Sequence, residues 1–136
     1  MHEWALAEGV VTTALEAARQ HRTQRIDRLV VKIGQLQQIE RELFATALDA
    51  VRRDSPGPLD DAEFVLQIEA ARFHCRACSA DFPYEEAVGS LSHEEAEAIH
   101  FVPELAHGYA CCPACQSPDF EVVQGRGVWL DAIEGA

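Results

Sequence analysis

Two pairs of closely spaced cysteines constrain the fold of this chain more than any other feature. Cys75 and Cys78 enclose two residues, and Cys112 and Cys115 enclose two more. A turn of this length directs two thiolates at one ion, so two such turns give a closed tetrahedral shell of four sulfur ligands. Zn(II) is the expected ion, and iron in a rubredoxin-like site is the alternative. Because no coordination position stays open, we predict a structural metal that holds a module with little core of its own.

A fifth cysteine and a long interval complicate the simplest version of this site. Cys111 directly precedes the second pair, but Cys112 and Cys115 repeat the spacing of the first pair, so we predict that Cys111 is not a ligand. The interval between the pairs, residues 79–111, is also longer than the roughly 15–20 residues that separate the pairs of a compact ribbon. Loops of such length in compact domains are usually functional or disordered. The second half of this insert is apolar, which favours packing against another part of the protein.

The rest of the sequence alternates between helical and extended patterns. Apolar residues recur every three or four positions over residues 3–20 and 40–53, which predicts two amphipathic helices. Alternating or β-branched apolar residues predict short strands at 26–33, 64–68, 120–123 and 128–133. The order is therefore helix, strand, helix, strand, followed by the cysteine region and two further strands.

These patterns predict an α+β fold made of two domains. Residues 1–70 and 126–136 form one domain, in which two helices pack on a small, mainly three-stranded sheet. Residues 71–125 form an inserted zinc-ribbon-like domain, which carries both cysteine knuckles and the long insert 79–111. The last strand returns to the first sheet because the short elements before it cannot cover the apolar faces of both helices.

Composition excludes several classes of protein. The formal net charge is −12, and no cluster of Lys and Arg lies near either knuckle, so we expect no nucleic-acid partner. No cationic leader and no apolar run of about 18 residues is present, so we expect neither a signal peptide nor a membrane span. A cytoplasmic location follows, and there cysteines point to metal binding before disulfides. The many acids between residues 80 and 110 are a solvated face or a surface for a basic partner.

The first residues of the chain offer a second metal site. The α-amine of Met1, the backbone nitrogen of His2 and the His2 imidazole can lie in one plane and close two chelate rings on one ion. Planar nitrogen coordination suits Ni(II) or Cu(II) and does not suit Zn(II). The alternative is a solvated histidine. The fourth position of the plane stays open, and the insert, which carries His100 and His107, is the element that can supply a ligand there.

With these residues in view, the chain resembles the hydrogenase nickel-insertion accessory proteins of the HypA family. The resemblance rests on Met1-His2-Glu3-Trp4, on Val31-Lys32-Ile33-Gly34-Gln35-Leu36, on the two knuckles, and on the tail from Asp119 to Val128. It covers the whole chain in order. The long interval between knuckles resembles the archaeal-type members, whose insert reads like Ile99-His100-Phe101-Val102-Pro103-Glu104.

The resemblance implies a nickel metallochaperone, not an enzyme. Such a protein receives Ni(II), works with a HypB-type GTPase, and delivers nickel to the large subunit of [NiFe] hydrogenase. The implied nickel ligands are Met1 and His2, with Glu3 adjacent and His100 from the insert, and His107 is the next candidate. The implied zinc ligands are the same four cysteines, Cys75, Cys78, Cys112 and Cys115. We expect a monomer or a weak homodimer.

Two other functions compete with nickel delivery. The first is a zinc-ribbon scaffold for protein interactions that transfers no nickel. The second is a metalloenzyme that uses His2 and Glu3, but the sequence contains no arrangement of nucleophile and base that supports it.

Overall fold

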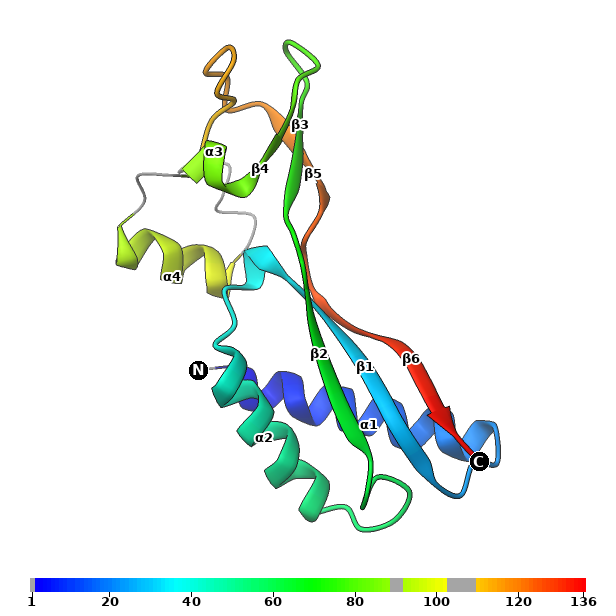
Figure 1. Cartoon of the computed structure of the whole chain (residues 1–136). Helices are drawn as coiled ribbons and strands as arrows, with labels where there is room; N and C mark the ends of the chain where they lie inside the picture. Colours follow the sequence, from blue (N-terminus) through cyan, green and yellow to red (C-terminus); the bar gives the residue numbers. More distant parts are fainter. Residues whose placement is uncertain (1, 89–91, 103–109) are drawn as a thin grey trace. The chain divides into compact units, whose positions relative to one another are not determined.

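The structure is a computed structural model that describes residues 2–88, 92–102 and 110–136. The side chains of Val88, Ala96, Ile99 and His100 lie outside this description. The elements in chain order are α1 (Glu3–Gln20), β1 (Ile26–Gly34), η1 (Gln35–Gln37), α2 (Arg41–Arg53), β2 (Glu63–Glu69), β3 (Arg72–Cys75), β4 (Asp81–Pro83), α3 (Tyr84–Val88), α4 (His93–Phe101), β5 (Phe120–Gln124) and β6 (Val128–Gly135) (Figure 1). The predicted α+β class is confirmed.

The chain divides into two compact units. The first contains residues 1–32, 39–67 and 128–136, and the second contains residues 33–38 and 68–127. The first therefore holds α1, α2, β6 and most of β1 and β2, whereas the second holds the cysteines and the short helices α3 and α4. None of the described helices is long and apolar enough to cross a membrane.

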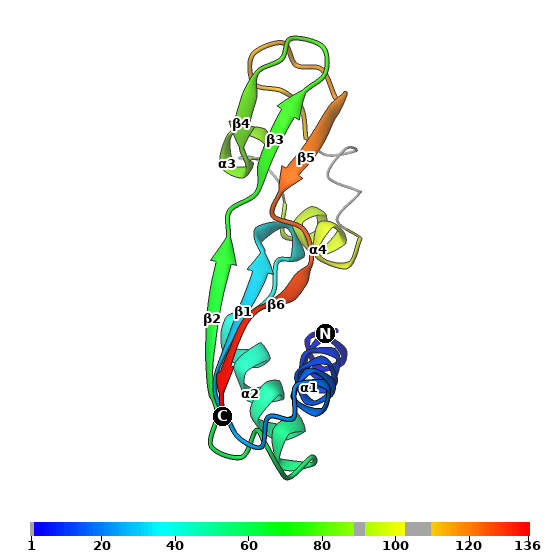
Figure 2. The same ribbon diagram turned by 90° about the vertical axis from the view of Figure 1, so that its right-hand side faces the viewer.

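The first unit is a three-stranded sheet with two helices on one face. The strand order is β2-β1-β6, so the last strand of the chain pairs with the first. Figures 1 and 2 show α1 and α2 on the same face of this sheet. The buried stripe of α1 consists of Ala7, Val10, Val11, Ala14 and Ala18, which recur at the three- and four-residue spacing of a helix. Most of β1 is buried because it is the central strand.

The second unit is built on a second three-stranded sheet with the order β4-β3-β5. Both pairings of β3 are antiparallel, with Phe73 opposite Phe82 on one side and Val122 on the other. The rings of Phe73, Phe82 and Phe120 are fully buried, and their centroids lie 5.1 to 5.7 Å apart. The module therefore has more core than the cysteine pattern led us to expect, because these three rings form one buried cluster with Cys75 and Cys112.

Residues 33–38, which comprise the end of β1, η1 and Gln38, belong to the second unit. Leu36 of η1 is fully buried in the same cluster as the three phenylalanines. A Cβ atom on Gly34 would lie 2.2 Å from the carbonyl oxygen of Gly125, and that close approach of two backbones requires glycine. The Gln35 amide accepts a hydrogen bond from the backbone N–H of Ala71 and donates one to Glu85. This segment is therefore fixed by backbone contact, burial and hydrogen bonds.

Candidate metal centre

The four paired cysteines meet at one point of the second unit. The sulfur atoms of Cys75 and Cys115 lie 3.6 Å apart, those of Cys78 and Cys112 lie 3.7 Å apart, and all four lie within 4.8 Å of one another. Four sulfurs at the usual Zn–S distance of about 2.3 Å form a tetrahedron with edges of roughly 3.8 Å. The Cys75–Cys115 and Cys78–Cys112 separations are close to this edge length, so the arrangement suits a tetrahedral zinc ion. Among the described residues it is the one group of three or more His, Cys, Asp or Glu side chains close enough to share an ion.

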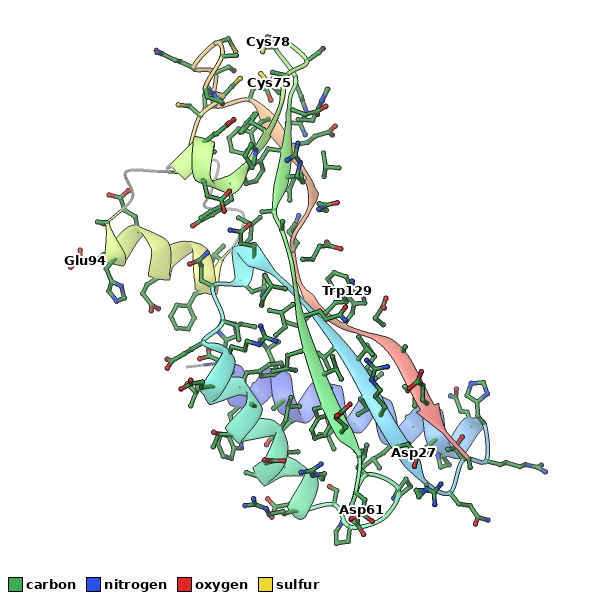
Figure 3. All side chains as sticks on the ribbon, viewed as in Figure 1. Asp27, Asp61, Cys75, Cys78, Glu94 and Trp129 are labelled. Atoms are coloured by element: carbon green, nitrogen blue, oxygen red, sulfur yellow. The ribbon has the colours of Figure 1, made fainter. Side chains whose placement is uncertain are left out.

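The first knuckle lies at the end of β3 and turns back into β4 (Figure 3). The Cys75 N–H donates to the carbonyl of Ala80, and the Ser79 N–H donates to the carbonyl of Cys75. Ser79 has a φ of 64°, which is the left-handed conformation that reverses the chain after Cys78. The Cys78 N–H also approaches the Cys75 sulfur at 3.5 Å. Two cysteines spaced in this way therefore face the same point.

The second knuckle repeats this geometry before β5. The Cys112 N–H donates to the carbonyl of Ser117, and the Gln116 N–H donates to the carbonyl of Cys112. Gln116 has a φ of 62°, which matches Ser79 of the first knuckle. The two turns are thus equivalent, and each places one buried and one exposed thiol at the centre. The spare cysteine, Cys111, is exposed and is not part of the four-sulfur group.

The thiols differ in acidity in the absence of a metal. A backbone hydrogen bond from Cys78 lowers the pKa of Cys75 to about 7, against the effect of burial. For Cys115, a backbone hydrogen bond from Ser117 acts to lower the pKa, but the neighbouring Cys75 thiol and burial outweigh it and raise the pKa to about 12. The thiolate is the form of cysteine that binds a metal, so the lowered pKa favours the metal-binding form of Cys75.

A hydrogen bond and an ion pair lie beside the first knuckle. The His74 imidazole lies 2.7 Å from the Asp81 carboxylate, and these residues are directly opposite each other on β3 and β4. Arg76, inside the first knuckle, donates to the carboxylate of Asp119 at 3.0 Å and to the carbonyl of Phe120 at 3.2 Å. Arg76 was not predicted to contact this site, because only the fold brings it close to residues so distant in the chain.

The proposed nickel ligands are described only in part. His2 is half-buried and lies directly before α1, and its carbonyl accepts the first helical hydrogen bond, from Leu6. Glu3 is 3% exposed and is the one buried charged residue in the described part of the chain. His100 belongs to α4, but its side chain, together with Met1 and His107, lies outside the described residues.

The fold and site define a class of protein: an α+β metal-binding protein with a four-thiolate zinc-ribbon-type module. The chain matches the family model "Hydrogenase/urease nickel incorporation, metallochaperone, hypA" over residues 1–135. It is 40% identical to the hydrogenase maturation factor HypA of Thermococcus sibiricus, a match that covers 98% of this chain and 96% of the relative. The HypA protein of Thermococcus onnurineus is also 40% identical, with 98% and 95% covered. The chain therefore belongs to the HypA family of hydrogenase maturation factors.

Solved structures support the fold. The solution structure of the Ni metallochaperone HypA from Helicobacter pylori has a TM-score of 0.64 and 23% identity, and the match covers 99% of this chain and 97% of that one. A second solution structure of a HypA protein has a TM-score of 0.60 and 22% identity, with 100% and 97% covered. At this level of identity the likeness concerns the fold alone.

Proposed function

We propose that this protein carries Ni(II) at its N-terminus and delivers it, with a GTPase partner, to the large subunit of [NiFe] hydrogenase. The observation that carries this proposal is the family match over residues 1–135, on a chain that begins Met1-His2-Glu3. The Met1 amine, the His2 backbone nitrogen and the His2 imidazole supply three planar nitrogen ligands, which suit Ni(II). His2 precedes α1, and the first amides of a helix have no partner within the helix, so the His2 nitrogen is not needed for the helical ladder.

The nickel test uses purified chain without a tag or any extra residue before Met1. Titration with Ni(II) should give the yellow, diamagnetic spectrum of a square-planar complex. His2→Ala should abolish this spectrum, and so should two glycines added before Met1, because the Met1 amine becomes an amide and His2 moves to position 4. A single glycine is avoided, since histidine at position 3 would still form a planar chelate with the new amine and two backbone nitrogens. His21→Ala is the matched control, since His21 is an exposed histidine at the other end of α1. A planar spectrum that survives the two-glycine extension would reject the chelate.

We propose that His100 is the fourth nickel ligand, ahead of His107. His100 belongs to α4, an element of the insert between the two knuckles. His100→Ala should leave zinc bound, weaken nickel binding and change the planar spectrum, because water or Glu3 takes the empty position. His93→Ala is the control, since His93 lies on the same helix and its side chain is 88% exposed. If the His100 variant and the wild type bind nickel with equal affinity, His100 is a packed side chain and not a nickel ligand.

The zinc module has a different role in this proposal. The four cysteines hold one Zn(II), and the ion supplies structural cross-linking between the two knuckles. No coordination position stays open for exchange, so delivery concerns nickel alone. Nickel leaves by ligand substitution, in which donors of the acceptor replace His100 first and the planar chelate afterwards. Acid favours release, because the amine and imidazole must lose their protons to bind. A scaffold without nickel transfer would keep zinc and show no planar nickel spectrum.

The proposed partners are a HypB-type GTPase and the hydrogenase large subunit, in the cytoplasm. We propose a monomer or weak homodimer as the working state, which light scattering after size exclusion measures directly. Nickel transfer to purified, nickel-free large subunit, with and without the GTPase and GTP, tests the delivery step. Transfer that is independent of His2 would contradict the proposed route.

A further inference from the structure

The strand β2 forms one edge of the sheet in the first unit, because the strand order is β2-β1-β6. In Figure 1 no strand lies on the outer side of β2. An edge strand presents N–H and C=O groups that its one neighbour does not pair, and a strand of another molecule can pair with them. The outer edge of β2 is therefore a template for strand pairing between molecules.

The sequence of β2 makes this edge prone to pairing. Between Glu63 and Glu69 the strand reads Phe64-Val65-Leu66-Gln67-Ile68, with no charge, no proline and no glycine. Short segments of high β-propensity and low charge are the ones that pair with copies of themselves. The acids at both ends oppose such pairing, but repulsion between exposed charges is screened beyond about 8 Å at physiological ionic strength. These acids therefore protect the middle of the strand only weakly.

Two arginines of α2 occupy backbone carbonyls of this strand. Arg41, the first residue of α2, donates to the carbonyl of Leu66 at 2.6 Å. Arg52, near the end of the same helix, donates to the carbonyl of Ala62, directly before β2, also at 2.6 Å. The carbonyls of alternate residues in a strand point to the same side, so those of Ala62 and Leu66, four residues apart, lie on one edge. The two arginines thus occupy acceptors at both ends of the apolar segment.

Further contacts fix the position of Arg52. Its guanidinium pairs with Asp49 and lies over the ring of Phe64, 4.9 Å from the centroid, and its side chain is only 19% exposed. A cavity of about 180 Å³ between α2 and β2 is lined by Ala45, Asp49, Arg52, Ala62, Phe64 and Leu66. The side chain of Arg52 therefore takes up part of the space beside β2 that an added strand would need.

We propose that Arg41 and Arg52 block the edge of β2 against pairing with the β2 strand of a second copy of this chain. A second copy is the relevant partner because identical apolar segments pair well with one another, and every molecule supplies one. To pair, the incoming strand must displace both arginines from the carbonyls that they occupy. Hydrogen bonds from a charged donor are stronger than those from a neutral one, so an incoming backbone N–H competes poorly for these carbonyls. This control of self-association goes beyond nickel delivery and does not depend on it.

The test removes both arginines and measures self-association of the purified chain by sedimentation velocity over a series of protein concentrations. Arg41→Ala/Arg52→Ala should self-associate at least about tenfold more tightly than the wild type, because two charged donors no longer compete for the edge. Arg53→Ala/Arg72→Ala is the matched control, since it removes the same charge from two exposed residues whose side chains form no hydrogen bond or ion pair with the described part of the chain. The control should associate no more tightly than the wild type. Zinc content and circular dichroism show that each variant is folded.

Hydrogen exchange locates the surface through which the double variant associates. The backbone amides of residues 64–68 should exchange more slowly as the concentration of the double variant rises, and those of the control should not change. If the double variant does not fold, Arg41→Ala alone decides, because Arg41 is exposed and its loss leaves the contacts of Arg52 in place. The single variant should show a smaller change in the same direction.

Three results would overturn the proposal. The first is equal self-association of the arginine variant, the control and the wild type. The second is association of the variant without slower exchange in β2, since another surface would then be responsible. The third is a wild-type chain whose β2 amides already become protected at high concentration, because the edge would then be open with both arginines in place.

Discussion

Replacing Phe73 by leucine should weaken zinc binding, although Phe73 is not a metal ligand. Phe73 is fully buried, and its ring lies 5.4 Å from that of Phe82 and 5.1 Å from that of Phe120. An aromatic pair of this kind contributes about 0.5–1.5 kcal/mol beyond burial. Leucine keeps most of the apolar contact but removes both pairs, so the expected loss is about 2 kcal/mol.

The lost core stability weakens zinc binding because the core and the knuckles share the same strands. Phe73 precedes Cys75 on β3, and Phe120 lies opposite Cys75 at the start of β5. If the module folds only when zinc binds, free energy lost from its core is lost from zinc binding. A change of about 2 kcal/mol then corresponds to roughly 30-fold weaker zinc affinity.

Competition with a coloured zinc chelator measures this affinity. Val123→Ala on β5 is the matched control, because Val123 is 59% exposed and its loss should cost no more than about 0.5 kcal/mol. A Phe73→Leu chain that binds zinc as tightly as the wild type would refute the reasoning. It would mean that the three rings fold the module before the metal arrives.

Three further predictions concern the same module. Cys112→Ser should lose zinc and Cys111→Ser should keep it, as metal analysis of the two purified variants will show, because Cys111 is outside the four-sulfur group. Zinc binding should release more protons at pH 6 than at pH 8, since the Cys75 thiol with a pKa of about 7 is mostly protonated at pH 6 and already ionised at pH 8. Ionisation of Cys75 alone lowers the number of protons released by about 0.8 between pH 6 and pH 8. Calorimetry in buffers of different ionisation enthalpy measures this number, and equal numbers at the two pH values would contradict the assignment. Gly34→Ala should destabilise the chain by about 1–3 kcal/mol in urea unfolding, because its Cβ would overlap the Gly125 carbonyl, and an unchanged midpoint would show that this backbone contact yields easily.

Much of the fold was predictable because local patterns and tertiary packing agree. The apolar spacing of residues 3–20 predicted α1 at its observed bounds, and the two residues enclosed by each cysteine pair predicted knuckles that the structure brings together. The return of the last strand to the first sheet followed from the need to cover two apolar helix faces, and β6 does pair with β1.

Other features have no local signature. The predicted strand ended at Ile33 and no element was predicted for residues 34–38, yet Leu36 is buried among the phenylalanines of the second unit. The ion pair of Arg76 with Asp119 joins residues from different knuckles, and no periodicity marks either partner. The expectation that the zinc module has little core of its own was wrong for the same reason. Phe73, Phe82 and Phe120 are each isolated in sequence, and only the pairing of β3 with β4 and β5 brings them together.

The difference between the two proposed metal sites follows from where their ligands come from. The zinc ligands lie on two equivalent turns, each closed by its own backbone hydrogen bonds and joined through one aromatic core. For the ion to leave, both turns must therefore open together. The proposed nickel ligands come from the end of the chain and from the insert, and not from turns closed by shared backbone hydrogen bonds. An ion bound in that planar site can lose its ligands one at a time, while the fold of the zinc module stays unchanged.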